Sequence, residues 1–334
     1  MTSGPVRLGR WPTPLHRLER LGTALGSPPL YVKRDDLCGF GLAGTKARSL
    51  ECVLSDALDR GCDTLVVGGG PRSNLVAAAA WAAAVVGVRC VAVLYGPPPQ
   101  VIHPNLALTR WLGAQLRFTG DRDRSSVDDM LPLVVEELAR AGARPYGLPR
   151  GGATPVASAG VALAVAEVAE QFEAVAAQPA TLVVATGSGG IHAGLLAGVH
   201  GAGTGWQVVG VSVSRPPHEV EGRVHQLATA CAAAHGWSPP PPSAVVVHDA
   251  RGGGYGVPSA AGREAARLAA TTEGLLLDPV YTAKAMAGLV TLVERGLDGP
   301  VLLWHTGGTG GALDDLQQLA AGSIPLQEER RGNQ

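Results

Sequence analysis

The segment TLVVATGSGGIHAG, residues 181 to 194, decides the fold class of this chain. It begins with an apolar run of strand length, turns on three glycines, and continues into a stretch of helical composition, IHAGLLAGV. A strand that ends in glycines and leads directly into a helix is the first part of a βαβ unit. The second strand follows as WQVVGVSVS at residues 206 to 214. The segment therefore predicts a parallel sheet that binds a ligand where its strands end.

The same pattern occurs twice more along the chain. One copy places the helical stretch AAAAWAAAVVG between two apolar runs, TLVVGGG at residues 64–70 and CVAVLYG at 90–96. The other reads GLLLDPVY at 274–281 as a strand, followed by the helical KAMAGLVTLVERG and the strand PVLLWHTGG. The final SIPLQEERRGNQ, residues 323–334, is typical of a frayed tail. These repeated units predict an α/β protein with two open, twisted, mostly parallel sheets flanked by helices.

Composition restricts the class of protein. The chain has 334 residues, of which 46% are hydrophobic and 16% charged, and its net charge is −1. Such a chain forms a compact globule without electrostatic attraction to nucleic acid or to an anionic membrane. No apolar leader or span is apparent, so we expect a cytoplasmic protein. The five cysteines form no CxxC pair, and the nine histidines show no metal-binding spacing, so we expect no metal site.

The glycine turn is a candidate phosphate site. Inward-facing N–H groups, a serine hydroxyl and the positive end of the next helix can hold one phosphate. A tight turn without any ligand is the alternative interpretation. Neither the GxxxxGK[ST] nor the full GxGxxG pattern is present, which disfavours a nucleotide-binding dehydrogenase. A single phosphate monoester therefore fits better than a dinucleotide at the turn formed by Gly187, Ser188, Gly189 and Gly190.

Lysines are scarce, which makes each one informative. Only Lys33, Lys46 and Lys284 occur. Lys46 lies in LAGTKARSLE, residues 42–51, where a glycine turn joins an extended stretch to a helical one. A lysine in this position can present its amine to a pocket as the nucleophile for an aldehyde cofactor. The alternative is a solvated surface lysine, which is the usual location of this residue type.

Six motifs in this order and spacing resemble the family of D-cysteine desulfhydrase and 1-aminocyclopropane-1-carboxylate (ACC) deaminase: LAGTKARSLE, GGGPRSN, GSGGIHAG, GYGVP, LLLDPVYTAKAMAGL and HTGG. Members of that family use pyridoxal phosphate and have the tryptophan synthase β-like fold, which is fold type II of these enzymes. The resemblance extends from about Thr13 to Gly311. It implies a pyridoxal phosphate enzyme that acts on a small amino acid.

The resemblance assigns roles to individual residues. Lys46 matches the Schiff-base lysine, and the glycine turn at residues 187–190 matches the phosphate cup. Ser73 and Asn74 match a pair at the start of a helix that holds the substrate carboxylate, although simple helix capping would also explain a Ser-Asn pair. We also expect Ser73 to take part in catalysis and Asn74 to contact the cofactor. The remaining matches are two tyrosines near the substrate and a threonine near the pyridine nitrogen, namely Tyr255, Tyr281 and Thr306.

Several residues differ from the family pattern. Thr282 stands where ACC deaminases carry Glu, which favours the desulfhydrase branch. We expect the remaining departures to line the substrate pocket: Thr45, Arg72, Leu75 and Ile191. If Arg72 points inward, it can recognise a second anionic group on the substrate, because guanidinium pairs bidentately with carboxylate. A solvated or internally paired Arg72 is the competing interpretation.

The resemblance implies a lyase or deaminase that removes the Cα proton and eliminates a β-substituent, most like D-cysteine desulfhydrase, with keto acid, ammonia and sulfide as products. Three alternatives stay open: ACC ring opening, β-replacement on a specialised biosynthetic amino acid, and a cofactor-binding protein without turnover. The family also implies a homodimer. Its architecture predicts a larger domain of residues 1–46 plus 151–334, and a smaller inserted domain of residues 47–150.

Overall fold

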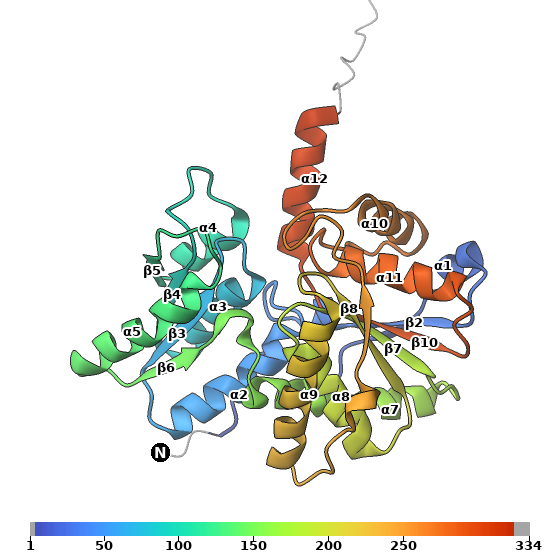
Figure 1. Ribbon diagram of the computed structural model, residues 1–334, viewed down its shortest axis with the longest axis horizontal. Coiled ribbons are helices and arrows are strands. Elements are labelled where there is room, and N and C mark those ends of the chain that lie inside the picture. The colour runs from blue at the N-terminus through green and yellow to red at the C-terminus, as the bar shows by residue number, and fades with distance from the viewer. Residues whose placement is uncertain (1–3, 324–334) are drawn as a thin grey trace, which may run out of the picture.

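The computed structural model describes residues 4–323 and contains two sheets flanked by helices (Figure 1). The larger sheet has six strands in the order β1-β2-β10-β7-β8-β9, and the smaller has four in the order β5-β4-β3-β6. Every neighbouring pair is parallel except β1 and β2. The prediction of two mostly parallel sheets flanked by helices is confirmed.

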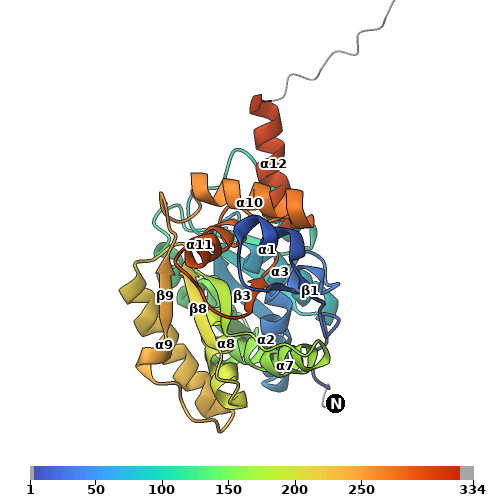
Figure 2. The same ribbon diagram turned by 90° about the vertical axis from the view of Figure 1, so that its right-hand side faces the viewer.

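The larger sheet draws its strands from both ends of the chain. In spatial order they are β1 (Leu15–Arg17), β2 (Leu30–Arg34), β10 (Val301–His305), β7 (Thr181–Thr186), β8 (Gln207–Ser212) and β9 (Val246–Asp249). Helices α1 (Glu19–Leu25), α10 (Ala260–Glu273) and α11 (Thr282–Glu294) cover one face in Figure 2. The other face carries α6 (Pro155–Ala162), α7 (Ala164–Ala174), α8 (Gly190–Ala202) and α9 (Pro217–Ala234). Both faces are therefore buried, which is typical of parallel strands joined by helical crossovers.

The smaller sheet is built from one continuous part of the chain. Its strands are β5 (Gln115–Phe118), β4 (Arg89–Leu94), β3 (Thr64–Gly69) and β6 (Pro145–Leu148). Helices α2 (Lys46–Asp59), α3 (Asn74–Val86) and α4 (Pro104–Trp111) lie on one side, and α5 (Ser126–Arg140) lies on the other. The boundaries proposed for the two domains stay a prediction.

The remaining elements are short or peripheral. Three 3-10 turns occur, η1 (Asp35–Leu37), η2 (Arg150–Gly152) and η3 (Pro242–Ala244). Helix α12 (Thr309–Ser323) extends away from the larger sheet in both views (Figures 1 and 2). The tail predicted for residues 323–334 lies outside the described residues from residue 324 onward. Between residues 4 and 323, no helix is both long and apolar enough to cross a lipid bilayer.

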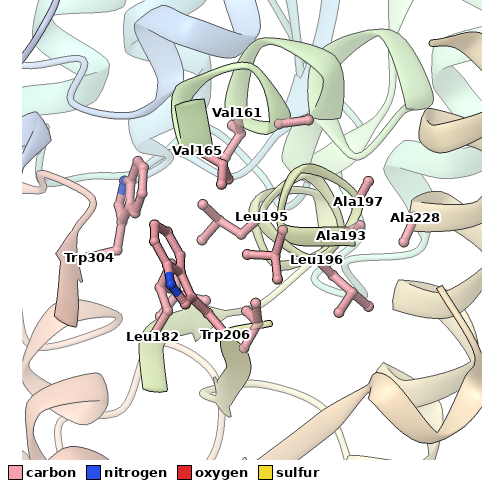
Figure 3. Packing of buried hydrophobic residues seen from close by; sticks show 14 of the residues in the cluster. Val161, Val165, Leu182, Ala193, Leu195, Leu196, Ala197, Trp206, Ala228 and Trp304 are labelled. Atoms are coloured by element: carbon pink, nitrogen blue, oxygen red, sulfur yellow. The ribbon is translucent and has the colours of Figure 1, made fainter. Parts of the chain in front are cut away.

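Side chains alternate between the two faces of the larger sheet, as strand geometry requires. In β10, Leu302 and Trp304 face the core under α6 to α9, whereas Val301 and Leu303 face the core under α1, α10 and α11. Figure 3 shows Trp304 and Leu182 beside Val165 and Leu195 of the covering helices. Burying each such aliphatic side chain contributes about 1.5–3 kcal/mol. This packing holds the strand ends, and therefore the loops that follow them, in fixed positions.

One predicted strand is wrong. GLLLDPVY at 274–281 forms an irregular segment instead of a strand. The neighbouring positions are already filled, because β10 pairs with β2 and β7 on its two sides. The segment instead runs past the end of β10, where the Leu276 carbonyl lies 3.1 Å from His305 Nε2. Its apolar residues Leu275 and Leu277 pack into the core below α11, which explains why the sequence resembles a buried strand.

Candidate active site

A cavity of about 440 Å³ opens where the strands of both sheets end. The larger sheet contributes the residues that follow β7, β8 and β10, and the smaller sheet contributes those that follow β3, β4 and β6. Open α/β sheets bind their ligands at this edge, because the loops there are free to converge. The position of the cavity matches the expectation drawn from the glycine-rich strand ends.

Lys46 is the first residue of α2 and lies in the wall of this cavity. Burial alone lowers the pKa of its amine from 10.5 to about 8. No carboxylate, carbonyl or hydroxyl among the described residues forms a hydrogen bond with Lys46 Nζ. A substantial fraction of this amine is consequently neutral near pH 8, and only the neutral form is a nucleophile.

The backbone that carries Lys46 is fixed against the end of β10. Thr45 N–H donates to the Thr306 carbonyl over 3.1 Å. Gly44 has φ of +57°, and a Cβ at this position would lie 2.1 Å from the same carbonyl oxygen. Only glycine permits this close approach. The glycine in LAGTK thus brings the start of α2 onto the HTGG turn, and Lys46 and Thr306 both line the cavity.

A buried ionic cluster includes Arg48, two residues after Lys46 in α2, and the sequence did not predict it. Arg48 donates two hydrogen bonds to Asp35 over 2.9 and 3.0 Å and two to Glu167 over 2.9 Å each. Lys33 also pairs with Glu167. Burial acts to raise the pKa of Asp35, but the Arg48 guanidinium and the hydrogen bonds from Thr13 and Thr45 together hold that pKa below its usual value. Two cations and two carboxylates therefore compensate one another inside the protein.

Thr45 belongs to this cluster, which corrects its assignment as a substrate-binding residue. Its hydroxyl donates to Asp35 Oδ2 over 2.8 Å and also lies 3.1 Å from Trp304 Nε1. Thr45 is completely buried and does not line the cavity. Its side chain points toward the ionic cluster because the helix that starts at Lys46 turns the neighbouring side chain away from the cavity.

The glycine turn after β7 forms the opposite wall. Gly187, Ser188, Gly189 and Gly190 all line the cavity, together with Ile191. Gly189 has φ of +92° and precedes α8, so the first N–H groups of the helix have no intrahelical acceptor. A Cβ on Gly187 would come within 3.2 Å of the Tyr281 ring, and a Cβ on Gly190 within 3.1 Å of Ala153 Cα. The turn is therefore an anion cradle whose width depends on the absence of side chains.

The Ser188 hydroxyl is not free to serve this cradle. It donates to the Gly151 carbonyl over 3.0 Å. Gly151 has φ of +79°, and a Cβ there would lie 2.6 Å from Ser188 Cβ, so the two turns pack closely. Of the hydrogen-bonding groups expected from Ser188, the backbone N–H remains for a ligand and the hydroxyl proton does not.

Two tyrosines meet on a third side of the cavity. The hydroxyls of Tyr255 and Tyr281 lie 2.8 Å apart, and their rings make an edge contact with centroids 6.0 Å apart. Burial raises the pKa of both hydroxyls, and for Tyr281 the neighbouring Tyr255 adds to the effect. Both tyrosines are neutral at neutral pH and retain protons that they can donate.

Asp278 holds the turn that presents Tyr281. Its carboxylate accepts hydrogen bonds from the N–H groups of Val280, Tyr281 and Thr282 and from the Thr282 hydroxyl, over 2.8–3.1 Å. Burial raises the pKa of Asp278 even though these bonds oppose the change. Lys284 performs a similar task for Tyr255, because its amine donates to the carbonyls of Arg251 and Gly254 over 2.7 and 2.8 Å. The tyrosine pair is thus positioned by two buried ionisable residues.

The Ser-Asn pair lies where the chain leaves β3, at the start of α3. Ser73 is the N-cap, and its hydroxyl accepts a hydrogen bond from Val76 N–H over 3.3 Å. Asn74 Oδ1 accepts from Asn105 Nδ2 over 2.8 Å, and the same Asn105 amide donates to the Arg72 carbonyl over 3.0 Å. Since Asn74 Oδ1 is engaged, its Nδ2 donor is the group that remains for a ligand in the cavity. Asn105 was missed because it lies 31 residues away in sequence.

The structure places twelve of the fourteen expected site residues in the cavity wall, and these are Lys46, Ser73, Asn74, Leu75, Gly187, Ser188, Gly189, Gly190, Ile191, Tyr255, Tyr281 and Thr306. Thr45 and Arg72 do not line the cavity. Arg72 is exposed, and only its backbone carbonyl contacts the site, through Asn105. A second anionic group in the cavity therefore gains no contact from Arg72.

Other charged residues that line the cavity escaped the sequence analysis: Arg124, Asp128, Arg150, Arg215, Arg223 and Asp278. They come from loops and helix starts in both sheets. Only Asp278, inside the LLLDPVY motif, carries a local sequence signal. The others are ordinary arginines and an aspartate in the sequence, and only the tertiary structure brings them together.

The cavity fits a cofactor that carries an aldehyde and one phosphate. Lys46 offers an amine of lowered pKa without a partner among residues 4–323, and the 187–190 turn offers backbone donors at a helix start on the facing wall. Among the same residues, no cluster of His, Cys, Asp and Glu could hold a metal ion. A lysine and a glycine-lined anion cradle in one cavity are the two elements that pyridoxal phosphate requires.

Comparisons with known proteins agree with this chemistry. A family model described as pyridoxal-phosphate dependent enzyme matches residues 6–307. The D-cysteine desulfhydrase of Salmonella newport (strain SL254) is 38% identical over 314 residues, covering 89% of this chain and 92% of that protein. A solved structure of an ACC deaminase homologue has 33% identity and a TM-score of 0.88, and the match covers 95% of each chain. An O-ureido-L-serine synthase structure, with 20% identity and a TM-score of 0.68 over 96% of this chain and 95% of that one, shares the fold.

The family model spans most of the chain, and the relatives match over nearly their full length. The expected fold type, the cofactor and the enzyme class, a lyase or deaminase, are confirmed together. This chain belongs to the family of pyridoxal phosphate-dependent enzymes that includes D-cysteine desulfhydrase and the ACC deaminase homologues.

Proposed function

We propose that this enzyme removes the Cα proton of a small amino acid and eliminates a β-substituent, with D-cysteine as the first substrate to test. The observation that carries the proposal is the presence in one cavity of an amine without a partner in the described chain, Lys46, and the hydroxyl pair of Tyr255 and Tyr281. An elimination of this kind needs a base for the Cα proton and an acid for the leaving group. The cavity contains candidates for both.

Pyridoxal phosphate, when bound, takes up the electrons released at the substrate Cα. In this proposal the Lys46 amine would hold the cofactor aldehyde, and as a free amine it would accept the Cα proton. Tyr281 would donate its proton to the departing β-substituent and regain one from Tyr255, which solvent would reprotonate. The raised pKa of both hydroxyls keeps them protonated and able to donate.

Ser73 and Asn74 are proposed to bind the substrate carboxylate. The start of α3 provides N–H groups without intrahelical acceptors, and the Asn74 amide has Nδ2 free because Asn105 holds its oxygen. A helix start attracts an anion through both of these features. Leu75 lines the same wall with an apolar side chain, which suits a small substrate without a polar group at that point.

The substrate preference rests on Thr282 and on the relatives. Thr282 is buried, donates through its N–H and hydroxyl to Asp278, and does not line the cavity. No carboxylate therefore follows Tyr281 in this chain, whereas the resemblance associates Glu at that position with ACC deaminases. The absence of that Glu and the 38% identity to a D-cysteine desulfhydrase support desulfhydration. The homodimer, the cytoplasmic location and the domain boundaries stay predictions.

The first experiment is an absorbance titration of the purified protein with pyridoxal phosphate, followed by D-cysteine, L-cysteine, D-serine, β-chloroalanine and ACC, while keto acid is assayed. The proposal expects a visible band of the lysine-bound cofactor that D-cysteine shifts, together with pyruvate and sulfide. Formation of 2-oxobutyrate from ACC would favour ring opening instead. A cofactor band that none of these compounds shifts would reject all five as substrates and point to a specialised amino acid.

A further inference from the structure

Three arginine-bearing segments surround the glycine turn that follows β7. Gly151, next to Arg150, accepts a hydrogen bond from the Ser188 hydroxyl over 3.0 Å. Ser214, next to Arg215, donates its hydroxyl to the Gly187 carbonyl over 3.3 Å. Arg223 donates directly, from Nε to the Ser188 carbonyl over 2.7 Å. All three arginines also line the cavity.

Only one of these three guanidinium groups lacks a carboxylate partner within the described chain. Arg150 pairs with Asp128, and Arg215 pairs with Glu219 over 3.4 Å. Arg223 makes no ion pair with any residue between 4 and 323, although it is partly buried in the second turn of α9. Burial, followed by repulsion from Arg215 and Arg150, lowers its pKa. A positive charge that burial and neighbouring cations disfavour is stabilised by an anion from outside the chain.

Within residues 187–190 no side-chain donor is available for a phosphate, and the nearest hydroxyl without a partner in the described chain is that of Thr186 at the end of β7, which also lines the cavity. The Ser188 hydroxyl is used by Gly151, and Ile191 occupies the position where the resembling family carries a threonine. Backbone N–H groups at the start of α8 remain, but they supply only partial positive charge. A phosphate monoester carries about two negative charges at neutral pH. Arg150 and Arg215 are already paired with Asp128 and Glu219, so Arg223 is the guanidinium near the turn whose charge is left for the phosphate.

We propose that Arg223 is a phosphate-binding residue of the cofactor site, in which its guanidinium supplies the charge that the 187–190 turn lacks while its Nε holds the Ser188 carbonyl. The ligand class is a dianionic phosphate monoester. This assignment rests on the proposed placement of the cofactor, with its aldehyde at Lys46 and its phosphate at the turn.

The test compares two forms of the cofactor, one with and one without the phosphate. Apoenzyme is titrated with pyridoxal phosphate and with pyridoxal, and Kd is read from the absorbance of the lysine-bound form. Arg223→Gln is expected to raise the Kd for pyridoxal phosphate roughly 10- to 100-fold, the usual range for loss of a hydrogen bond to a charged group. The Kd for pyridoxal should stay unchanged. Arg223→Lys is expected to retain most of the affinity because it retains the charge.

A control and a rescue separate charge from structure. Arg89→Gln removes an exposed arginine paired with Asp63, outside the cavity wall, and should leave both Kd values unchanged. Adding Ile191→Thr to Arg223→Gln should recover part of the lost affinity by supplying a hydroxyl donor. Inorganic phosphate should raise the melting temperature of wild-type apoenzyme and, by most of that amount, of Arg223→Lys, and it should have much less effect on Arg223→Gln.

The outcomes are distinguishable. If Arg223→Gln loses affinity equally for pyridoxal and for pyridoxal phosphate, Arg223 acts only on the structure and the inference is wrong. Unchanged Kd values in this variant would also overturn the inference. If the wild-type protein forms no lysine-bound cofactor at all, the proposed placement of the cofactor fails instead. The assignment would be established if Arg223→Gln loses affinity for pyridoxal phosphate but not for pyridoxal, while the control variant binds both as the wild type does.

Discussion

Lys33 is buried and Lys46, only thirteen residues later, is partly buried in the cavity wall, and their surroundings are opposite. Lys33 Nζ pairs with Glu167 and also donates to the Thr13 carbonyl and to Gln171 Oε1 over 2.7 and 2.6 Å. Lys46 has a lowered pKa of about 8 that burial alone produces, and no residue of the described chain accepts from its amine. The pKa of Lys33 is also lowered by burial, but its bond to Glu167 opposes the change.

This difference separates a lysine held in an ion pair from one whose amine has no partner in the described chain, as the proposed reaction requires. A compensated charge stabilises a particular packing, whereas an uncompensated amine gives up its proton readily and becomes a nucleophile. The two are connected through Thr45, whose hydroxyl bonds to the compensated cluster and whose peptide leads directly into Lys46. The ionic cluster therefore fixes the position of the reactive lysine without neutralising it.

The largest expected effect comes from Lys46→Ala. The variant should lose the visible band of the lysine-bound cofactor, and keto-acid formation should fall to background, because no other lysine lines the cavity. Its apoprotein should be as stable as wild type in urea, since no ion pair is removed. Keto-acid assay and absorbance spectroscopy provide the measurement. Turnover at the wild-type rate would overturn the assignment of Lys46.

Lys33→Met, in contrast to Lys46→Ala, should reduce the stability of the protein and leave cofactor binding intact. Removing one member of a buried ionic cluster is expected to reduce the free energy of unfolding by about 3 kcal/mol, because Glu167 and the Thr13 carbonyl lose a donor. The absorbance of the lysine-bound cofactor should persist in the folded fraction. Urea denaturation followed by circular dichroism measures the first quantity. An unchanged midpoint would mean that Lys33 is not part of a stabilising cluster.

Thr45→Val tests the connection between the two lysines. Loss of the hydroxyl bond to Asp35 should reduce stability by about 1.5 kcal/mol, since a buried charged acceptor loses a donor. KM for any substrate should stay unchanged, because Thr45 does not line the cavity. Steady-state kinetics beside thermal denaturation distinguishes the two effects. A raised KM with unaltered stability would restore the original interpretation of Thr45 as a substrate ligand.

The smallest expected effect is a dependence on pH. The neutral fraction of an amine with a pKa of about 8 rises about fivefold from pH 7 to pH 8 and levels off above pH 9. The rate at which apoenzyme takes up the cofactor aldehyde should follow this curve, rising as the proton leaves. Stopped-flow absorbance measures the rate. A rate that continues to rise tenfold per pH unit toward pH 10 would indicate an ordinary, solvated lysine.

The sequence was sufficient to predict features that depend on residues close together along the chain. The βαβ pattern identified the buried strands β3, β4, β7, β8 and β10, and the glycine turn and the Gly-flanked lysine identified two walls of the cavity. It failed at GLLLDPVY, where an apolar run can lie beside a sheet as easily as within it. Periodicity reports burial, but it does not report whether a pairing edge is free.

Arg72 and Arg223 show that local sequence patterns also fail to predict which side chains reach the cavity. Arg72 lies inside a recognisable motif, yet it is exposed, whereas Arg223 has no motif and lines the cavity. Adjacent side chains at a helix start point in different directions, so a motif places the backbone more reliably than each side chain. Contacts such as Arg223 to Ser188, 35 residues apart, have no local signature.

The sequence by itself determined the fold class through apolar periodicity and the cofactor through the family resemblance, and it predicted the lysine and the glycine turn because glycines and helix starts set the geometry of short segments. Only the tertiary structure decided which charges are compensated. Lys33 and Lys46 are the same residue type in neighbouring segments, and their difference arises from carboxylates and carbonyls up to 138 residues away. Electrostatic environment depends on distance in space, and folding alone fixes that distance.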